Sequence, residues 1–229
     1  MWTARVFTLY PEFFPGPLGH GLYKKAMENK IWSLKTINIR DFSLDKHKTV
    51  DDTPFGGGSG MVMRCDVLAN AIDKNVKGKN EQIIYLSPKG KKFDQKYARK
   101  MLDKNINIIC GHFEGVDQRL LETRNIEEVS VGDYVLSGGE IGAFVVIDTI
   151  VRLINGVVGN QNSLKEETFE RNLLEYPQYT KPQKWEEKEV PNVLLGGDHA
   201  KIKDWRLTQS DDITRRRRPD LWKKYKKNK

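Results

Sequence analysis

Residues 130–140 read SVGDYVLSGGE, and this stretch decides the fold because it joins a strand, a turn and a helix. The apolar strand enters a glycine turn, and Glu140 then opens an apolar helix that continues to about Ile154. A carboxylate in the first turn of a helix is favoured by the helix dipole. A strand followed by a helix is the repeating unit of an α/β fold.

The same alternation runs through the first two thirds of the chain. Apolar, β-branched runs predict strands, and helices are expected between them: strands at 5–10, 33–39, 82–87 and 106–111, helices near 21–30, 67–73 and 94–104. Buried strands that alternate with helices predict an α/β domain over residues 1–159, with a parallel sheet flanked by helices.

The character of the sequence changes after Gly159. The polar run NQNSLKEET predicts a flexible linker over residues 160–170. Beyond it, Asp198 can cap one helix and Pro219 can begin another, because these residue types are favoured at helix starts. We therefore expect a small α-helical domain over residues 171–229.

The formal charge of +8 belongs to the C-terminal end of the chain. Residues 201–229 hold twelve Lys or Arg and four Asp, whereas the other 200 residues are neutral overall. Aromatic residues lie among these cations, namely Trp205, Trp222 and Tyr225. Cations neutralise phosphates and aromatic faces stack on unpaired bases, so the segment indicates nucleic-acid binding. A solvated basic tail that aids solubility is the alternative.

Several other classes of protein do not fit the sequence. The longest apolar stretch, 141–154, is interrupted by Asp148 and Arg152 and falls short of the ~20 residues of a membrane span. The N-terminal residues lack the pattern of a secretory signal. Cys65 and Cys110 show no CxxC spacing, which disfavours a disulfide framework. We expect a cytoplasmic protein that has no membrane partner.

Three glycine-rich turns follow or end apolar runs: PFGGGSGM (54–61), ICGHFEGVD (109–117) and VGDYVLSGGE (131–140). Each alone is most simply a tight turn, but three at strand ends predict a ligand pocket, because glycine lets a ligand approach the backbone. None has the lysine and hydroxyl of a P-loop or the spacing of a GxGxxG dinucleotide site. The four histidines are scattered, so no metal site is predicted.

Longer motifs carry a resemblance to a known family. The strings YPEFF, RDF (40–42), HKTVDDTPFGGGSGMVM, YLSPKGKKFDQ, CGHFEGVDQR, SVGDYVLSGGE, ERNLLEYPQYTKP and WRLTQS occur in this order over nearly the whole chain. In sequence the chain resembles the bacterial tRNA (guanine-N1)-methyltransferases of the SPOUT, or trefoil-knot, superfamily. The resemblance implies a deep trefoil knot in the N-terminal domain, and a homodimer with its active site at the subunit interface.

The resemblance also implies the reaction and its ligands. A methyl group would pass from S-adenosylmethionine to N1 of the guanine at position 37 of tRNA, just 3′ of the anticodon. The donor-binding residues would be Pro88, Gly111, Glu114, Val131, Gly132, Asp133, Tyr134, Val135, Leu136, Gly138 and Gly139. Asp51 and Gly60 would receive the target guanine, Arg206 would contact the tRNA, and Mg²⁺ is a possible further cofactor.

The catalytic residues implied by the resemblance are Arg152 and Glu167. Guanine N1 carries a proton at neutral pH, so a base must remove it while a cation stabilises charge on O6. Arg152 takes the cation's position, and Glu167 stands where the family has an aspartate. The extra methylene shifts the reach of the carboxylate. Alternatively, Ser163 and Glu166 form a capping box with Glu167 as a first-turn carboxylate, and Glu175 is the second candidate base.

Two further departures lie in the 109–117 turn, where His112 and Phe113 replace an Arg-Tyr pair common in the family. We expect His112 to be a polar loop residue without a catalytic role. Two other functions stay open at this point. One is a non-catalytic RNA-binding protein that keeps the fold and the basic segment, and the other is a methyltransferase acting on rRNA or on another tRNA position.

Overall fold

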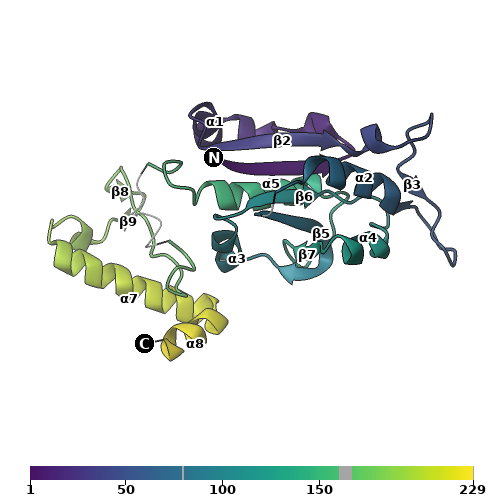
Figure 1. Ribbon diagram of the computed structural model, residues 1–229. Helices are drawn as coiled ribbons and strands as arrows, with labels where there is room; N and C mark the ends of the chain where they lie inside the picture. Colours follow the sequence, from purple (N-terminus) through teal and green to yellow (C-terminus); the bar gives the residue numbers. More distant parts are fainter. Residues whose placement is uncertain (79, 160–166, 229) are drawn as a thin grey trace. The chain divides into compact units, whose positions relative to one another are not determined.

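A computed structural model describes residues 1–78, 80–159 and 167–228. The chain divides into two compact units, Met1–Gly159 and Asn160–Lys229 (Figure 1). Residues 160–166 of the expected linker, with Ser163 and Glu166 of the expected capping box, lie outside the described residues. No helix of the described residues is both long and apolar enough to cross a membrane.

The first unit is built on a five-stranded parallel sheet with the order β2-β1-β6-β5-β7. Its strands are β1 (Trp2–Thr8), β2 (Trp32–Asn38), β5 (Glu81–Lys92), β6 (Asn105–Ile109) and β7 (Glu127–Ser130). A short antiparallel pair, β3 (Asp51–Asp52) with β4 (Val62–Met63), stands apart from the sheet. Central strands β1 and β6 are almost continuously buried, as expected where helices cover both faces of a parallel sheet.

Helices cover the sheet in two groups. The longer helices are α1 (Gly21–Glu28), α2 (Cys65–Asn75), α3 (Gln95–Lys100), α4 (Gln118–Thr123) and α5 (Glu140–Val151), and the 3₁₀ turns are η1 (Pro11–Phe13), η2 (Gly16–Gly19) and η3 (Ile39–Phe42). Helices α2 and α4 contact each other, and their apolar residues share one core with Phe7 and Ile109 of the sheet. Helix α5 contacts both α3 and β1.

The expected α/β class and parallel sheet are confirmed, and most element boundaries are close to the expectation. The strand expected at 33–39 is β2, and the helix expected from Glu140 is α5. Helix α4 was not expected, because QRLLET is too short for a clear helical period. The side chain of Asp117 accepts a hydrogen bond from the backbone N–H of Arg119 and so caps this helix.

The second unit contains two helices, α7 (His199–Arg217) and α8 (Pro219–Lys227), together with a hairpin, β8 (Lys184–Trp185) with β9 (Lys188–Glu189), and the turn η4 (Asn192–Leu194). Asp198 caps α7 by accepting hydrogen bonds from the backbone N–H groups of Ala200 and Lys201, and Pro219 begins α8. Both expected helix starts are therefore confirmed. Within the unit, the hydroxyl of Thr214 on α7 accepts a hydrogen bond from the backbone N–H of Leu174.

Candidate active site

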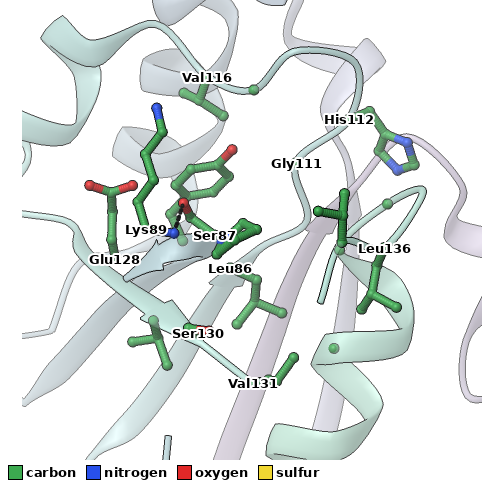
Figure 2. A pocket seen from close by; sticks show the side chains of 18 of the residues that line it. Leu86, Ser87, Lys89, Gly111, His112, Val116, Glu128, Ser130, Val131 and Leu136 are labelled. Atoms are coloured by element: carbon green, nitrogen blue, oxygen red, sulfur yellow. Dashed lines mark hydrogen bonds between the residues drawn. The ribbon is translucent and has the colours of Figure 1, made fainter. Parts of the chain in front are cut away.

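The first unit holds a pocket of about 290 Å³ at the carboxyl ends of β6 and β7 and beside residues 85–89 in the middle of β5. Figure 2 shows its walls coming from three stretches of chain: Leu86 and Ser87 of β5, Gly111 and His112 after β6, and Val131 and Leu136 after β7. Ligands of parallel α/β sheets bind at the carboxyl ends of the strands. The volume lies near the lower end of the ~300–1,000 Å³ typical of small-molecule sites.

The residues expected to bind the methyl donor gather around this pocket. Its lining includes Pro88, Gly111, Glu114, Val131, Gly132, Tyr134, Val135, Leu136, Gly138 and Gly139. Asp133 is exposed and does not line it. The structure therefore brings segments 85–89, 111–116 and 131–139 together, which are distant in sequence.

Glycine is required where two of these segments touch. The backbone N–H of Gly139 donates a hydrogen bond of 3.0 Å to the carbonyl oxygen of Gly111. A Cβ atom on Gly139 would lie 2.5 Å from Cα of Cys110. Any side chain at Gly139 would push the loops apart, so this glycine sets the width of the pocket.

A buried network fastens the loop after β6 to the start of α5. Glu140 is 3% exposed and accepts a 2.5 Å hydrogen bond from the hydroxyl of Thr8. Nε2 of His112 lies 2.9 Å from each oxygen of the same carboxylate. Burial, and then the charge of Glu140, raises the pKa of the Cys110 thiol well above its usual value. His112, expected to be a polar loop residue, lies in the loop after β6, where it is half-buried and contacts a buried acid.

The glycine-rich segment before α2 is fastened to the same loop. The N–H of Met63 donates to the carbonyl of Gly115 at 2.8 Å, and the N–H of Glu114 donates to the carbonyl of Met61 at 2.9 Å. Gly60 adopts a φ of +83°, and a Cβ atom there would lie 2.5 Å from Oε1 of Glu114. The expected guanine-binding Gly60 therefore adjoins the expected donor-binding Glu114. Asp51 pairs with Met63 in the β3–β4 hairpin.

Arg152 does not lie in this pocket. It is half-buried at the C-terminal cap of α5, whereas Gly139 caps the N-terminal end of the same helix. The 12-residue helix α5, which is about 18 Å long at 1.5 Å per residue, lies between the two positions. Near Arg152, burial and a hydrogen bond to Asp148 raise the pKa of Tyr23 to about 12. Within one chain, Arg152 therefore lies away from the pocket, at the opposite end of α5.

Three further expected residues belong to the second unit. Glu167 is half-buried, Glu175 is exposed, and Arg206 is half-buried on α7. The side-chain amide of Gln178 donates a 2.6 Å hydrogen bond to Oε1 of Glu175. The guanidinium of Arg206 stacks on the ring of Tyr176.

Other lining residues were missed by the sequence expectations. They are chiefly Tyr85, Leu86, Ser87, Lys89, Val116, Glu128, Val129, Ser130 and Gly142. Tyr85, Leu86 and Ser87 lie at the end of the strand expected at 82–87, which the structure continues to Lys92, and Glu128–Ser130 end β7. The ends of the expected strands were therefore the signal available for them. In the described part of the chain, no group of three or more His, Cys, Asp or Glu side chains could hold a metal ion.

Comparisons with known proteins point to one family. The family described as tRNA (Guanine-1)-methyltransferase TrmD matches residues 1–224. A tRNA (guanine-N(1)-)-methyltransferase of Pelagibacter ubique is 67% identical over 229 residues, which is 100% of both chains. Enzymes of the same name from Bartonella tribocorum and Rhodospirillum rubrum are 56% and 52% identical, covering 99% and 97% of this chain and 97% and 93% of their own.

The family match and these relatives extend over segments 85–89, 111–116 and 131–139, which form the pocket, as well as over the second unit. The chain therefore belongs to the TrmD family of tRNA (guanine-1)-methyltransferases, and it is a methyltransferase.

Proposed function

We propose that the chain transfers a methyl group from S-adenosylmethionine to N1 of guanine 37 in tRNA, and that the donor binds in the pocket of the first unit. One observation carries this proposal: the glycine-rich turns 109–117 and 131–140 meet residues 85–89 of β5 around one pocket, with Gly139 hydrogen-bonded to Gly111. Such loops expose backbone N–H and C=O groups to a ligand, which suits the adenine, ribose and amino-acid parts of the donor.

The pocket chemistry fits the donor. Apolar side chains such as Leu86 and Leu136 can cover a flat base, as their positions around the cavity in Figure 2 illustrate. Glu114 and Glu128 supply carboxylates at the pocket wall, and Lys89 supplies a cation. These groups match a ligand that carries a sulfonium, an ammonium and a carboxylate. The bound donor supplies an electrophilic methyl group on its sulfur.

In the proposed reaction Glu167 accepts the proton of guanine N1. The N1 electron pair forms the new bond to the methyl carbon, while the carbon–sulfur bond breaks and leaves its electrons on sulfur. Arg152 stabilises the negative charge that develops on O6 of the guanine. Asp51 and Gly60 receive the flipped guanine, and Gly60 supports this because it adjoins Glu114 of the donor pocket.

The separation of Arg152 from the pocket favours a homodimer. With about 18 Å of helix between the two, a second copy of the chain would bring its own groups to the first copy's pocket. Apolar side chains are exposed on and just before α5: Tyr134, Val135, Leu136, Ile141 and Val145. Exposed apolar side chains close together in sequence suit a protein interface. The proposed site thus lies between subunits.

The remaining features of the proposal concern the chain path, the RNA and the ion. The meeting of segments 85–89, 111–116 and 131–139 around one pocket supports a trefoil knot in the first unit, and the linker at 160–170 joins it to a tRNA-binding second unit. Exposed Arg215, Arg216 and Arg217 end α7 and can neutralise phosphates. A tRNA substrate places the enzyme in the cytoplasm. The described residues offer no cage for Mg²⁺, so no step is assigned to that ion.

The test is transfer of labelled methyl from S-adenosylmethionine to an unmodified tRNA transcript with guanine at position 37. Wild type is expected to form 1-methylguanosine, and Glu167→Gln is expected to lose the activity while still binding donor and tRNA. Glu175→Gln is the matched control, since it removes the other candidate carboxylate. Activity in Glu167→Gln would show that another residue acts as the general base. Binding of tRNA without any methylation by wild type would favour a non-catalytic RNA-binding protein.

A further inference from the structure

A second pocket, of about 470 Å³, lies wholly within the second unit. It is formed by the segment 176–183, by η4 and its neighbours, and by α7. Its side walls are aromatic: the rings of Tyr179 and Trp205 are 6.2 Å apart with an angle of 56° between them. Tyr179 is 47% exposed and lines the pocket together with Trp205, so a ligand in the pocket can contact both residues.

Arg206 forms the polar part of this pocket. Its guanidinium carbon lies 4.7 Å from the centroid of the Tyr176 ring, which fixes the plane of the cation. Its Nε atom is buried and has no hydrogen-bond partner among the described residues. A buried donor without an acceptor costs free energy, which a ligand oxygen would recover. Lys181 also lines the pocket, whereas no carboxylate does so in the described part of the chain.

We propose that this pocket captures one unstacked nucleotide of the tRNA, and the inference rests on tRNA being the substrate. The base lies against Tyr179 and Trp205, because every base presents a flat face that stacks on aromatic rings. A phosphate or carbonyl oxygen of the nucleotide accepts a hydrogen bond from Arg206. Because Lys181 and Arg206 line the pocket and no carboxylate of the described residues does, the pocket favours an anionic ligand. The rings of Tyr179 and Trp205 favour a planar one.

The two halves of the pocket have different roles in this recognition. Stacking on Tyr179 and Trp205 tolerates any base, so it grips an unpaired loop nucleotide without reading its identity. The contact from Arg206 gives direction, since stacking on Tyr176 holds the guanidinium of this lining residue in one orientation. The pocket would thereby distinguish a loop with a base free to leave the stack from a continuous helix.

The experiment measures binding of an unmodified tRNA transcript to the full-length protein by fluorescence anisotropy at two salt concentrations. Tyr179→Ala is expected to weaken binding at least about five-fold, since loss of one base–aromatic stack has an effect of roughly this size or larger. Arg206→Met is expected to weaken binding and to reduce the slope of affinity against salt by about one phosphate contact. Trp185→Ala is the matched control, because Trp185 is 64% exposed and does not line the pocket.

Further measurements distinguish a loss of nucleotide binding in this pocket from a folding defect and from a failure of the proposed function. Thermal unfolding and affinity for S-adenosylmethionine should equal those of wild type in Tyr179→Ala. A 2-aminopurine placed in turn at each anticodon-loop position should be quenched at one position by wild type and released by Tyr179→Ala. Wild type that binds tRNA but does not methylate it would refute the proposed function and leave the pocket intact.

Other outcomes would contradict the proposal that this pocket binds a nucleotide. If Tyr179→Ala and Arg206→Met bind tRNA as tightly as Trp185→Ala does, no nucleotide enters it. An equal loss for a fully paired RNA hairpin stem would show that only phosphate attraction is involved. If Tyr179→Ala instead alters self-association without changing tRNA affinity, the occupant is a second copy of the chain.

Discussion

Nε2 of His112 lies 2.9 Å from both carboxylate oxygens of Glu140, and this pair fastens the loop after β6 to the first turn of α5. The loop carries Gly111 and Glu114, and the helix begins directly after Gly138 and Gly139. The His112–Glu140 contact therefore connects two of the three segments that form the proposed donor pocket.

Replacing His112 by alanine removes one partner of a buried carboxylate. The loss of a partner from a buried hydrogen-bonding group costs about 1–3 kcal/mol, so we expect lower stability and roughly ten-fold weaker donor binding. Calorimetric titration with S-adenosylmethionine measures this effect. His47→Ala is the control, because His47 is exposed outside the pocket. Equal donor affinity in wild type and His112→Ala would show that the contact does not shape the pocket.

Gly60 and Gly57 form a matched pair for testing the contact between the glycine-rich segment and Glu114. Both have a positive φ, +83° and +78°, but a Cβ atom on Gly60 would collide with Glu114 whereas one on Gly57 meets nothing within 4 Å. Each alanine substitution costs about 1–2 kcal/mol of backbone strain. Only Gly60→Ala should also displace Glu114 and lower kcat/KM for tRNA methylation. Steady-state kinetics that fall equally in both variants would leave strain as the whole explanation.

Much of the fold was predictable, because β-branched runs such as QIIYLS mark buried strands and Asp198 and Pro219 are ordinary helix-start residues. The pocket was predictable only in outline. A glycine turn shows where a ligand can approach, but not that Gly139 touches Gly111, since this contact depends on the packing of α5. The pairing of His112 with Glu140 was missed for the same reason: the two residues are 28 positions apart and meet through tertiary structure alone.

The stability of the first unit should depend on Tyr23 at high pH. Burial and a hydrogen bond to Asp148 raise the pKa of Tyr23 to about 12 in the folded protein, above its value of 10.0 in an unperturbed tyrosine. The neutral hydroxyl is favoured in the fold, so its contribution is full below pH ~10 and is lost as pH rises toward ~12. Chemical denaturation between pH 9 and about 11.5 should show a shallower decline for Tyr23→Phe than for wild type. Parallel curves would show that Tyr23 ionises equally readily in both states.

The exposed apolar face of α5 should be a subunit interface. Ile141 and Val145 are 52% and 42% exposed and stand one turn apart on the same face of the helix. A charge buried at an interface is costly, so Val145→Asp should convert a dimer into monomers. Analytical ultracentrifugation measures the mass directly. Leu207→Asp is the control at a leucine of similar exposure, 38%, in the second unit. A monomeric wild type would contradict the prediction that this face of α5 is a subunit interface.

The central claim is tested most directly by locating the product in the RNA. A tRNA transcript with guanine at position 37 is incubated with wild-type protein and S-adenosylmethionine, digested, and analysed by mass spectrometry. We predict one added methyl group, at N1 of guanine 37, and none in a transcript with adenine at that position. Methylation at another nucleotide or another atom of guanine, or an unmodified transcript despite bound donor and tRNA, would contradict the proposed reaction.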